Sequence, residues 1–166
     1  MSFNILRILS FFFFLILQGV LFKNVVLFHT AFCFIYILYI LRFPVETNPL
    51  VLMLIAFTLG LGVDMFYDST GLHAMASVFL AYLRKVWLMR ITPQGGYDRN
   101  SMPTLTTQGL QWFLIYALPL VFMHHTVLFF TEAGSILYFW SFLLKIFAST
   151  LFTVVAMTIG QMLFSR

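Results

Sequence analysis

The chain has 166 residues, of which 62% are hydrophobic and only 8% are charged, and its formal net charge is +4. A mean hydropathy of +1.01 is too high for a soluble domain of this size, whose surface must be hydrated. The composition therefore indicates an integral membrane protein. Membrane topology explains the small positive charge better than nucleic-acid binding does, so we expect no nucleic-acid partner.

Six apolar segments are long enough to cross a bilayer as helices, although several are near the lower length limit. The polar breaks between them are short, so we expect one transmembrane domain over residues 1–166. The sequence thus predicts an all-α, integral membrane six-helix bundle. The sixth segment ends at Leu163 and begins between Ile136 and Phe142, and the other five cover Ile5–Phe22, Val25–Leu41, Pro49–Asp64, Gly71–Leu88 and Gly109–His125.

Basic residues gather at one set of segment ends, and only Lys23 and Lys145 lie elsewhere. By the positive-inside rule, that set faces the cytoplasm, which places both termini there. The residues that carry this prediction are Arg7, Arg42, Arg84, Lys85, Arg90, Arg99 and Arg166.

Small residues four positions apart are typical of faces where membrane helices pack closely. Ala56 and Gly60 form such a pair in the third segment, and Ser77 and Ala81 form another in the fourth. The last segment has two more pairs, Ser149 with Thr153 and Ala156 with Gly160. We interpret all of them as helix-packing positions within the bundle.

The break between the third and fourth segments carries Asp64 and Asp68, two of the five carboxylates of the chain, together with Ser69, Gly71 and His73. Charge near membrane depth is costly and usually has a partner or a function. One interpretation is that Asp64 closes a helix while Asp68 and Ser69, with Thr70, cap the next one. Another is that Asp64 bonds backbone donors at the start of the fourth helix, and a third is that the break contacts a partner protein.

The sequence offers no complete catalytic or metal-binding set. Asp64 and Asp68 are spaced like paired metal-binding aspartates, but the D-G and A-R pairs of membrane CDP-alcohol phosphotransferases are missing. His73, His124, His125 and Glu132 fall near one membrane face, yet nothing in their spacing enforces a zinc or proton site. The single cysteine, Cys33, excludes a disulfide framework and a cysteine-based metal site. We expect no enzyme activity, catalytic residue, metal or cofactor.

The G-x-x-x-D pattern from Gly60 to Asp64, followed by Gly71-Leu72-His73-Ala74 and by Ala81-Tyr82-Leu83, resembles the MreD family of bacterial rod shape-determining membrane proteins. The likeness also extends to Leu41–Thr47, to Thr92-Pro93 with Gly96-Tyr97-Asp98, and to the run from Gln111 to Tyr116 before His124, with Arg42 as a departure. The matching residues of the central segment are Gly60, Asp64, Ser69, Gly71, Leu72, Ala74, Ala81, Tyr82 and Leu83.

The resemblance implies a non-catalytic scaffold in the bacterial inner membrane. It would belong to the elongasome, the complex that carries out peptidoglycan synthesis along the side wall and maintains rod cell shape. Its implied partners are an MreC-like single-pass protein, and, directly or through it, RodA, a class B penicillin-binding protein and MreB filaments, besides membrane lipid. The implied fold is similar to the substrate-binding subunits of energy-coupling-factor transporters.

That similarity leaves a second hypothesis, in which the chain is the vitamin-binding subunit of a membrane transporter. Such subunits carry small residues in the first helix, where Leu9 to Leu17 are bulky here. For a scaffold, we expect the partner to contact the break from Asp64 to His73 and the neighbouring helix faces. Gly71 would serve a close turn or a close helix approach there.

Overall fold

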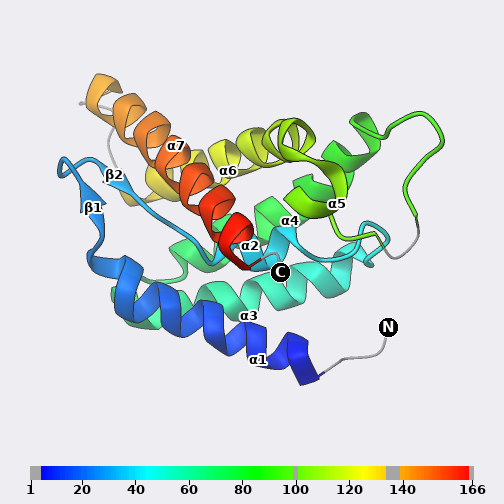
Figure 1. The fold of residues 1–166 in the computed structure, drawn as a ribbon. Helices are drawn as coiled ribbons and strands as arrows, with labels where there is room; N and C mark the ends of the chain where they lie inside the picture. The colour runs from blue at the N-terminus through cyan, green and yellow to red at the C-terminus, as the bar shows by residue number, and fades with distance from the viewer. Residues whose placement is uncertain (1–4, 99–100, 134–138, 165–166) are drawn as a thin grey trace.

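The structure is a computed structural model that describes residues 5–98, 101–133 and 139–164. Within them the protein is all-α apart from one short β-hairpin, as Figure 1 shows. Arg99, Arg166 and the stretch from Ile136 to Tyr138, where the last helix was expected to begin, lie outside the described residues. The helices are α1 (Ile5–Ile16), α2 (Ile37–Leu41), α3 (Pro49–Tyr67), α4 (Leu72–Arg90), α5 (Leu105–Gln108), α6 (Leu110–Ala133) and α7 (Phe139–Phe164).

Four helical stretches of the described chain are long and apolar enough to cross a membrane, which indicates a multi-pass membrane protein. A fifth helix, α4, has 19 residues but is not among the four, and it carries three basic side chains. A π-helical turn (Leu17–Leu21) and a 3-10 turn (Phe22–Asn24) extend α1 in the first stretch. The four are Ile5–Asn24, Pro49–Tyr67, Leu110–Ala133 and Trp140–Leu163.

The predicted second helix over Val25–Leu41 is wrong. The chain instead forms an antiparallel hairpin of β1 (Val26–Leu27) and β2 (Ala31–Phe32), then runs extended to the five-residue α2. Every residue from Cys33 to Leu41 is at most 7% exposed. β-Branched and aromatic residues dominate this stretch, and they suit extended backbone better than helix.

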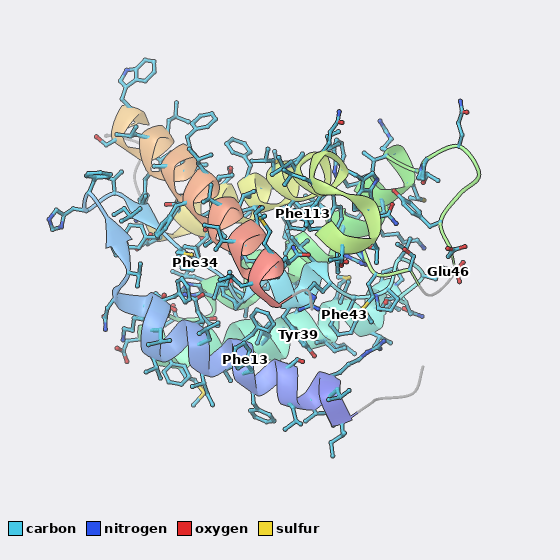
Figure 2. All side chains as sticks on the ribbon, viewed as in Figure 1. Phe13, Phe34, Tyr39, Phe43, Glu46 and Phe113 are labelled. Atoms are coloured by element: carbon cyan, nitrogen blue, oxygen red, sulfur yellow. The ribbon has the colours of Figure 1, made fainter. Side chains whose placement is uncertain are left out.

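The segment 25–41 returns the chain from one end of the molecule to the other. In Figure 1 the hairpin lies at one end, with the close of α3 and of α6, and the N-terminus and α5 lie toward the opposite end. Because α1 and α3 run in the same direction, the connection between them must travel back through the core. Figure 2 labels Phe34, on this segment, and Phe113, on α6, in the interior, where both are buried.

The long helices pack in sequence, with α3 along α4, α4 along α6 and α6 along α7, while α1 contacts α3. The expected packing residues Ala56, Gly60, Ser77 and Ala81 are all buried. Gly60 lies at the closest approach, because a Cβ added there would be 2.5 Å from the Cα of Ala74. The absence of a side chain at Gly60 therefore sets the distance between α3 and α4.

We expect Gly60→Ala to lower the thermal unfolding midpoint of the detergent-purified protein, because α3 and α4 must separate to admit the methyl group. Overpacking of this kind typically costs about 1–3 kcal/mol. Gly160→Ala is the matched control, since no described atom lies within 4 Å of a Cβ at that position. Equal midpoints for the two variants would contradict the close α3–α4 approach.

Candidate functional site

Asp64 joins the end of α3 to the start of α4. Its Oδ1 accepts from the backbone N–H of His73 at 3.0 Å, and its Oδ2 accepts from the N–H of Ala74 at 3.0 Å. The N-cap residue of α4 is Gly71, which has no side chain to offer these donors. Asp64 therefore supplies from α3 the acceptor that an N-cap side chain normally supplies. This is the intramolecular arrangement that the sequence left open.

Asp64 is 3% exposed, and both oxygens of its carboxylate accept hydrogen bonds from within the protein. Oδ1 also accepts from Ser69 Oγ at 2.5 Å and lies 2.9 Å from Nδ1 of His73. Three of these contacts fall on Oδ1 and one on Oδ2, out of about four lone-pair positions that a carboxylate offers. The side chain consequently has little capacity left for a metal or for a partner protein.

The expected caps Asp68 and Ser69 do not cap α4. Asp68 adopts left-handed backbone (φ 54°) as the residue that ends α3, and its side chain is 92% exposed, 3.9 Å from Nζ of Lys23. Ser69 bonds Asp64 and not the backbone of α4. A carboxylate one helical turn earlier, on the inner face of α3, reaches the first N–H groups of α4 instead.

Glycine is needed at position 71 because of its backbone conformation and not because neighbouring atoms crowd it. Its φ of 86° is in the left-handed region that L-residues rarely adopt, and no described atom lies within 4 Å of a Cβ built there. The expected close helix approach is therefore made at Gly60, and Gly71 serves the turn alone.

The extended segment would leave backbone groups unpaired inside the bundle without help from side chains. Hydroxyls of α7 accept from it, Ser149 Oγ from the N–H of Phe32 at 3.0 Å and Thr153 Oγ1 from the N–H of Phe34 at 3.1 Å. Gln18 Nε2 donates to the carbonyl of Cys33 at 3.1 Å. Non-helical backbone at membrane depth is tolerated only where protein satisfies it in this way.

Sequence reasoning missed the role of Gln18. It lies in the π-helical turn Leu17–Leu21, is fully buried, and also donates to the hydroxyl of Tyr67 at 2.8 Å. The sequence does contain a sign of this role, because a glutamine inside a 20-residue apolar stretch needs a buried hydrogen-bond partner. The sequence likewise predicts only helix packing for Ser149 and Thr153, although their hydroxyls bond the extended segment.

A second polar chain runs across the core from α4 to α6. Ser77 Oγ donates to the hydroxyl of Tyr36 at 3.2 Å, and that hydroxyl lies 2.8 Å from Nε2 of His124. The neighbouring His125 turns its Nδ1 to the carbonyl of Val121 at 2.7 Å.

The histidines surround the ring of Phe34 without forming a metal site. Ring centroids of His73, His124 and His125 lie 5.4, 6.3 and 5.3 Å from that of Phe34. The described residues contain no group of three His, Cys, Asp or Glu side chains placed to hold a metal. Glu132, which the sequence places near the same membrane face as these histidines, pairs with Lys145 at 2.8 Å.

Arg84 anchors the other end of the extended segment. Its guanidinium is 2% exposed, donates to the hydroxyl of Tyr116 at 2.7 Å, and donates to the carbonyls of Phe43 and Pro44. The Tyr116 hydroxyl in turn donates to the carbonyl of Leu41 at 3.0 Å. Arg84, which the sequence indicates only as one of the basic residues at the segment ends, thus holds the carbonyls that follow α2.

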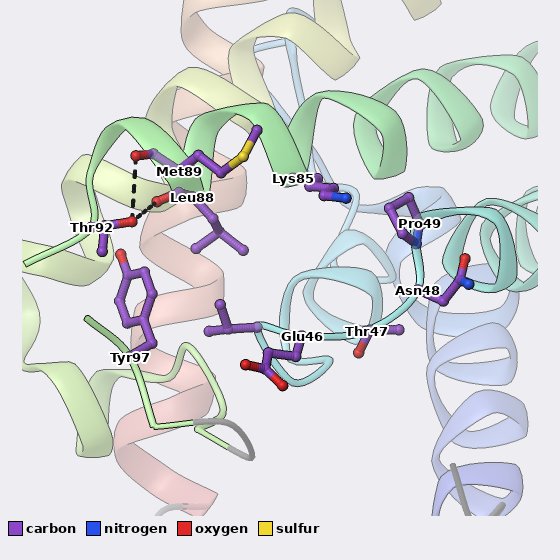
Figure 3. A pocket seen from close by; sticks show the side chains of 10 residues that line it. Glu46, Thr47, Asn48, Pro49, Lys85, Leu88, Met89, Thr92 and Tyr97 are labelled. Atoms are coloured by element: carbon purple, nitrogen blue, oxygen red, sulfur yellow. Dashed lines mark hydrogen bonds between the residues drawn. The ribbon is translucent and has the colours of Figure 1, made fainter.

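A cleft of about 520 Å³ opens beside this anchor, as Figure 3 shows. Lys85 enters it from α4 and Glu46 from the loop after α2, so both charges line it. Burial raises the pKa of the Tyr97 hydroxyl, which donates to the carbonyl of Ile91 at 3.0 Å. The full lining is Val45, Glu46, Thr47, Asn48, Pro49, Lys85, Leu88, Met89, Thr92 and Tyr97.

Comparisons of the chain with protein-family profiles, with curated proteins and with solved structures found no match.

We expect Asp64→Ala to destabilise the first turn of α4, because the N–H groups of His73 and Ala74 lose their acceptors. A buried donor left unpaired costs about 1–3 kcal/mol. Hydrogen–deuterium exchange should show faster exchange of these two amides. Asp68→Asn is the control, since that side chain is 92% exposed and asparagine tolerates the left-handed backbone at this position. Unchanged protection in Asp64→Ala would mean that the carboxylate does not cap the helix.

We expect Arg84→Gln to loosen the chain after α2, because two buried carbonyls lose a charged donor. Hydrogen bonds to charged groups are worth about 1.5–3 kcal/mol each. Limited proteolysis in detergent should then cleave within residues 41–48, where the wild type resists. Lys85→Gln, at the adjacent exposed position, should leave the digestion pattern unchanged. Identical patterns for both variants would argue against the anchor.

Proposed function

We propose that this chain is a non-catalytic membrane scaffold of the bacterial cell-wall elongation complex, of the MreD type. In this role it binds an MreC-like single-pass protein in the inner membrane and supports RodA with its penicillin-binding partner. Cytoplasmic MreB filaments connect to it through the same partner.

The observation that carries the proposal is the joint between α3 and α4. Residues on which the resemblance depends meet there with separate tasks: Gly60 sets the helix approach, Asp64 caps α4, Ser69 bonds that carboxylate, and Gly71 makes the turn. All four lie within residues 60–71, and their separate tasks in one helix–turn–helix joint give the pattern a structural cause.

The proposed topology has six crossings with both termini in the cytoplasm. Five are helical, and the second is the extended segment 25–41 with α2 at its end. Arg7, Arg42, Arg84 and Lys85 then share the cytoplasmic end, in keeping with the positive-inside rule. The proposed likeness to six-helix transporter subunits rests on this order of crossings.

The partner surface that we propose is the outer face of α3 and the rim where it ends. Exposed apolar side chains recur there every three or four residues, which makes one continuous helical stripe that another membrane helix can contact. The stripe leads to exposed Asp68 at the rim. Its members are Leu50, Leu54, Phe57, Leu61 and Met65.

The vitamin-transporter alternative requires a ligand cavity on the outer side. The cavity described there, between His73 and the Glu132–Lys145 pair, has a volume of about 90 Å³. Ligand pockets usually measure about 300–1,000 Å³. This comparison favours the scaffold over the vitamin-binding subunit.

The test is a mild-detergent pull-down of the tagged native protein, with a photo-crosslinking amino acid at Leu61 or Met65. We expect crosslinks to a single-pass coiled-coil protein, and co-purification of a SEDS glycosyltransferase. Met89, an exposed residue on α4 away from the stripe, is the control position and should not crosslink to it.

Depletion of the protein in the native host supplies the second readout. Loss of rod shape and of side-wall synthesis is expected. Normal shape under depletion, or recovery of a transporter's ATPase and coupling subunit in the pull-down, would exclude the proposed role.

A further inference from the structure

A lateral groove of about 370 Å³ lies between α1 and α7. Its floor is the buried segment around α2, including Ile35 and Leu38, which are 5% and 4% exposed. None of the lining residues is acidic. They are Ser10, Phe13, Phe14, Leu17, Phe22, Ile35, Leu38, Arg42, Ala156, Gly160 and Gln161.

The groove is polar at one end and apolar along the rest. Ser10 is in the early part of α1, Arg42 directly follows α2, and Gln161 is near the end of α7, so all three belong to the end of the molecule where the basic residues gather. From there toward the hairpin end the walls are aromatic and aliphatic, through Leu17 to Phe22. A single lipid molecule lying along the helices would have the same distribution, with a polar headgroup at one end and an apolar acyl chain along the rest.

Gln161 is the built polar contact of this site. It is 7% exposed, and its Oε1 accepts from the N–H of Leu105 at 2.9 Å, which fixes the amide. Its Nε2, which has no hydrogen-bond partner among the described residues, belongs to a side chain that lines the groove. A buried N–H donor of this kind requires an acceptor.

The positive charges at the polar end of the groove favour an anionic ligand. Arg42 is exposed and lines the groove, and the guanidinium of Arg7 lies 5.6 Å above the ring of the adjacent Phe43. Basic pockets between membrane helices on the cytoplasmic side are suited to anionic headgroups. A phosphate at this end would pair with Arg42 and lie beside the amide of Gln161.

The size of the groove favours an acyl chain over a partner helix. A helix is about 10 Å across and rises about 5.4 Å per turn, so less than one turn would fill 370 Å³. We propose that the groove binds an anionic phospholipid, with an acyl chain between α1 and α7 and the phosphate at Arg42 and Gln161. The inference goes beyond the proposed scaffold role and does not depend on it.

The experiment is native mass spectrometry of the full-length protein titrated with phosphatidylglycerol or phosphatidylcholine in detergent micelles. We expect tighter binding of phosphatidylglycerol. Arg42→Gln should weaken it about fivefold, the effect of removing one arginine near an anionic lipid. Gln161→Glu should weaken it too, because the acceptor for Leu105 remains while the donor becomes an anion. Arg90→Gln, an exposed arginine outside the groove, is the matched control.

The acyl end is tested with Gly160→Leu, which extends a side chain into space where no described atom lies within 4 Å of a Cβ. This variant should fold and lose lipid, whereas Ser141→Leu, an exposed position at the far end of α7, should retain it. Equal binding of the two lipids by the wild type, or unchanged binding by the three groove variants, would overturn the proposal. A crosslink from Ser10 to a partner's membrane helix in place of lipid would overturn it as well.

Discussion

The structure depends on satisfying an extended stretch of backbone inside a helical bundle. The N–H groups of Phe32, Phe34 and Tyr36 and the carbonyl of Cys33 bond no helical backbone, and no water competes for them in a membrane interior. Ser149, Thr153 and Gln18 fill this need from two different helices. The positions of α1 and α7 are therefore tied to the segment between them, and the π-helical turn around Gln18 belongs to the same requirement.

The far end of the segment is held by a different means. Arg84 and Tyr116 bring α4 and α6 to the carbonyls after α2, and Tyr36 joins the same two helices through Ser77 and His124. This segment thus makes polar bonds to four of the five long helical stretches. Networks of this kind make a core specific, because a shifted register would leave several buried groups unpaired at once.

The sequence predicted the membrane class, the all-α character, and five long helices to within a few residues at most ends, because apolar length and flanking charges report directly on them. It failed for Val25–Leu41, since apolar length alone does not separate a helix from a buried extended segment. At the site, Asp64 and Gly71 were visible as a charge and a glycine in a break. Their tasks, and those of Gln18 and Arg84, depend on contacts between helices that spacing along the chain does not encode.

The hydrogen bonds that the polar side chains make inside the protein indicate which surfaces remain free to bind a protein partner or a lipid. Asp64, Tyr36 and Arg84 are committed to internal bonds, so altering them changes the fold before it changes a partner contact. Polar groups that face outward are Asp68 at the rim where α3 ends, Glu46 and Lys85 in the cleft beside Arg84, and Arg42 at the end of the groove. A protein partner reaching α3 and a lipid between α1 and α7 would therefore occupy separate surfaces. Binding at one surface leaves the other accessible, as a scaffold that holds a partner within a lipid bilayer requires.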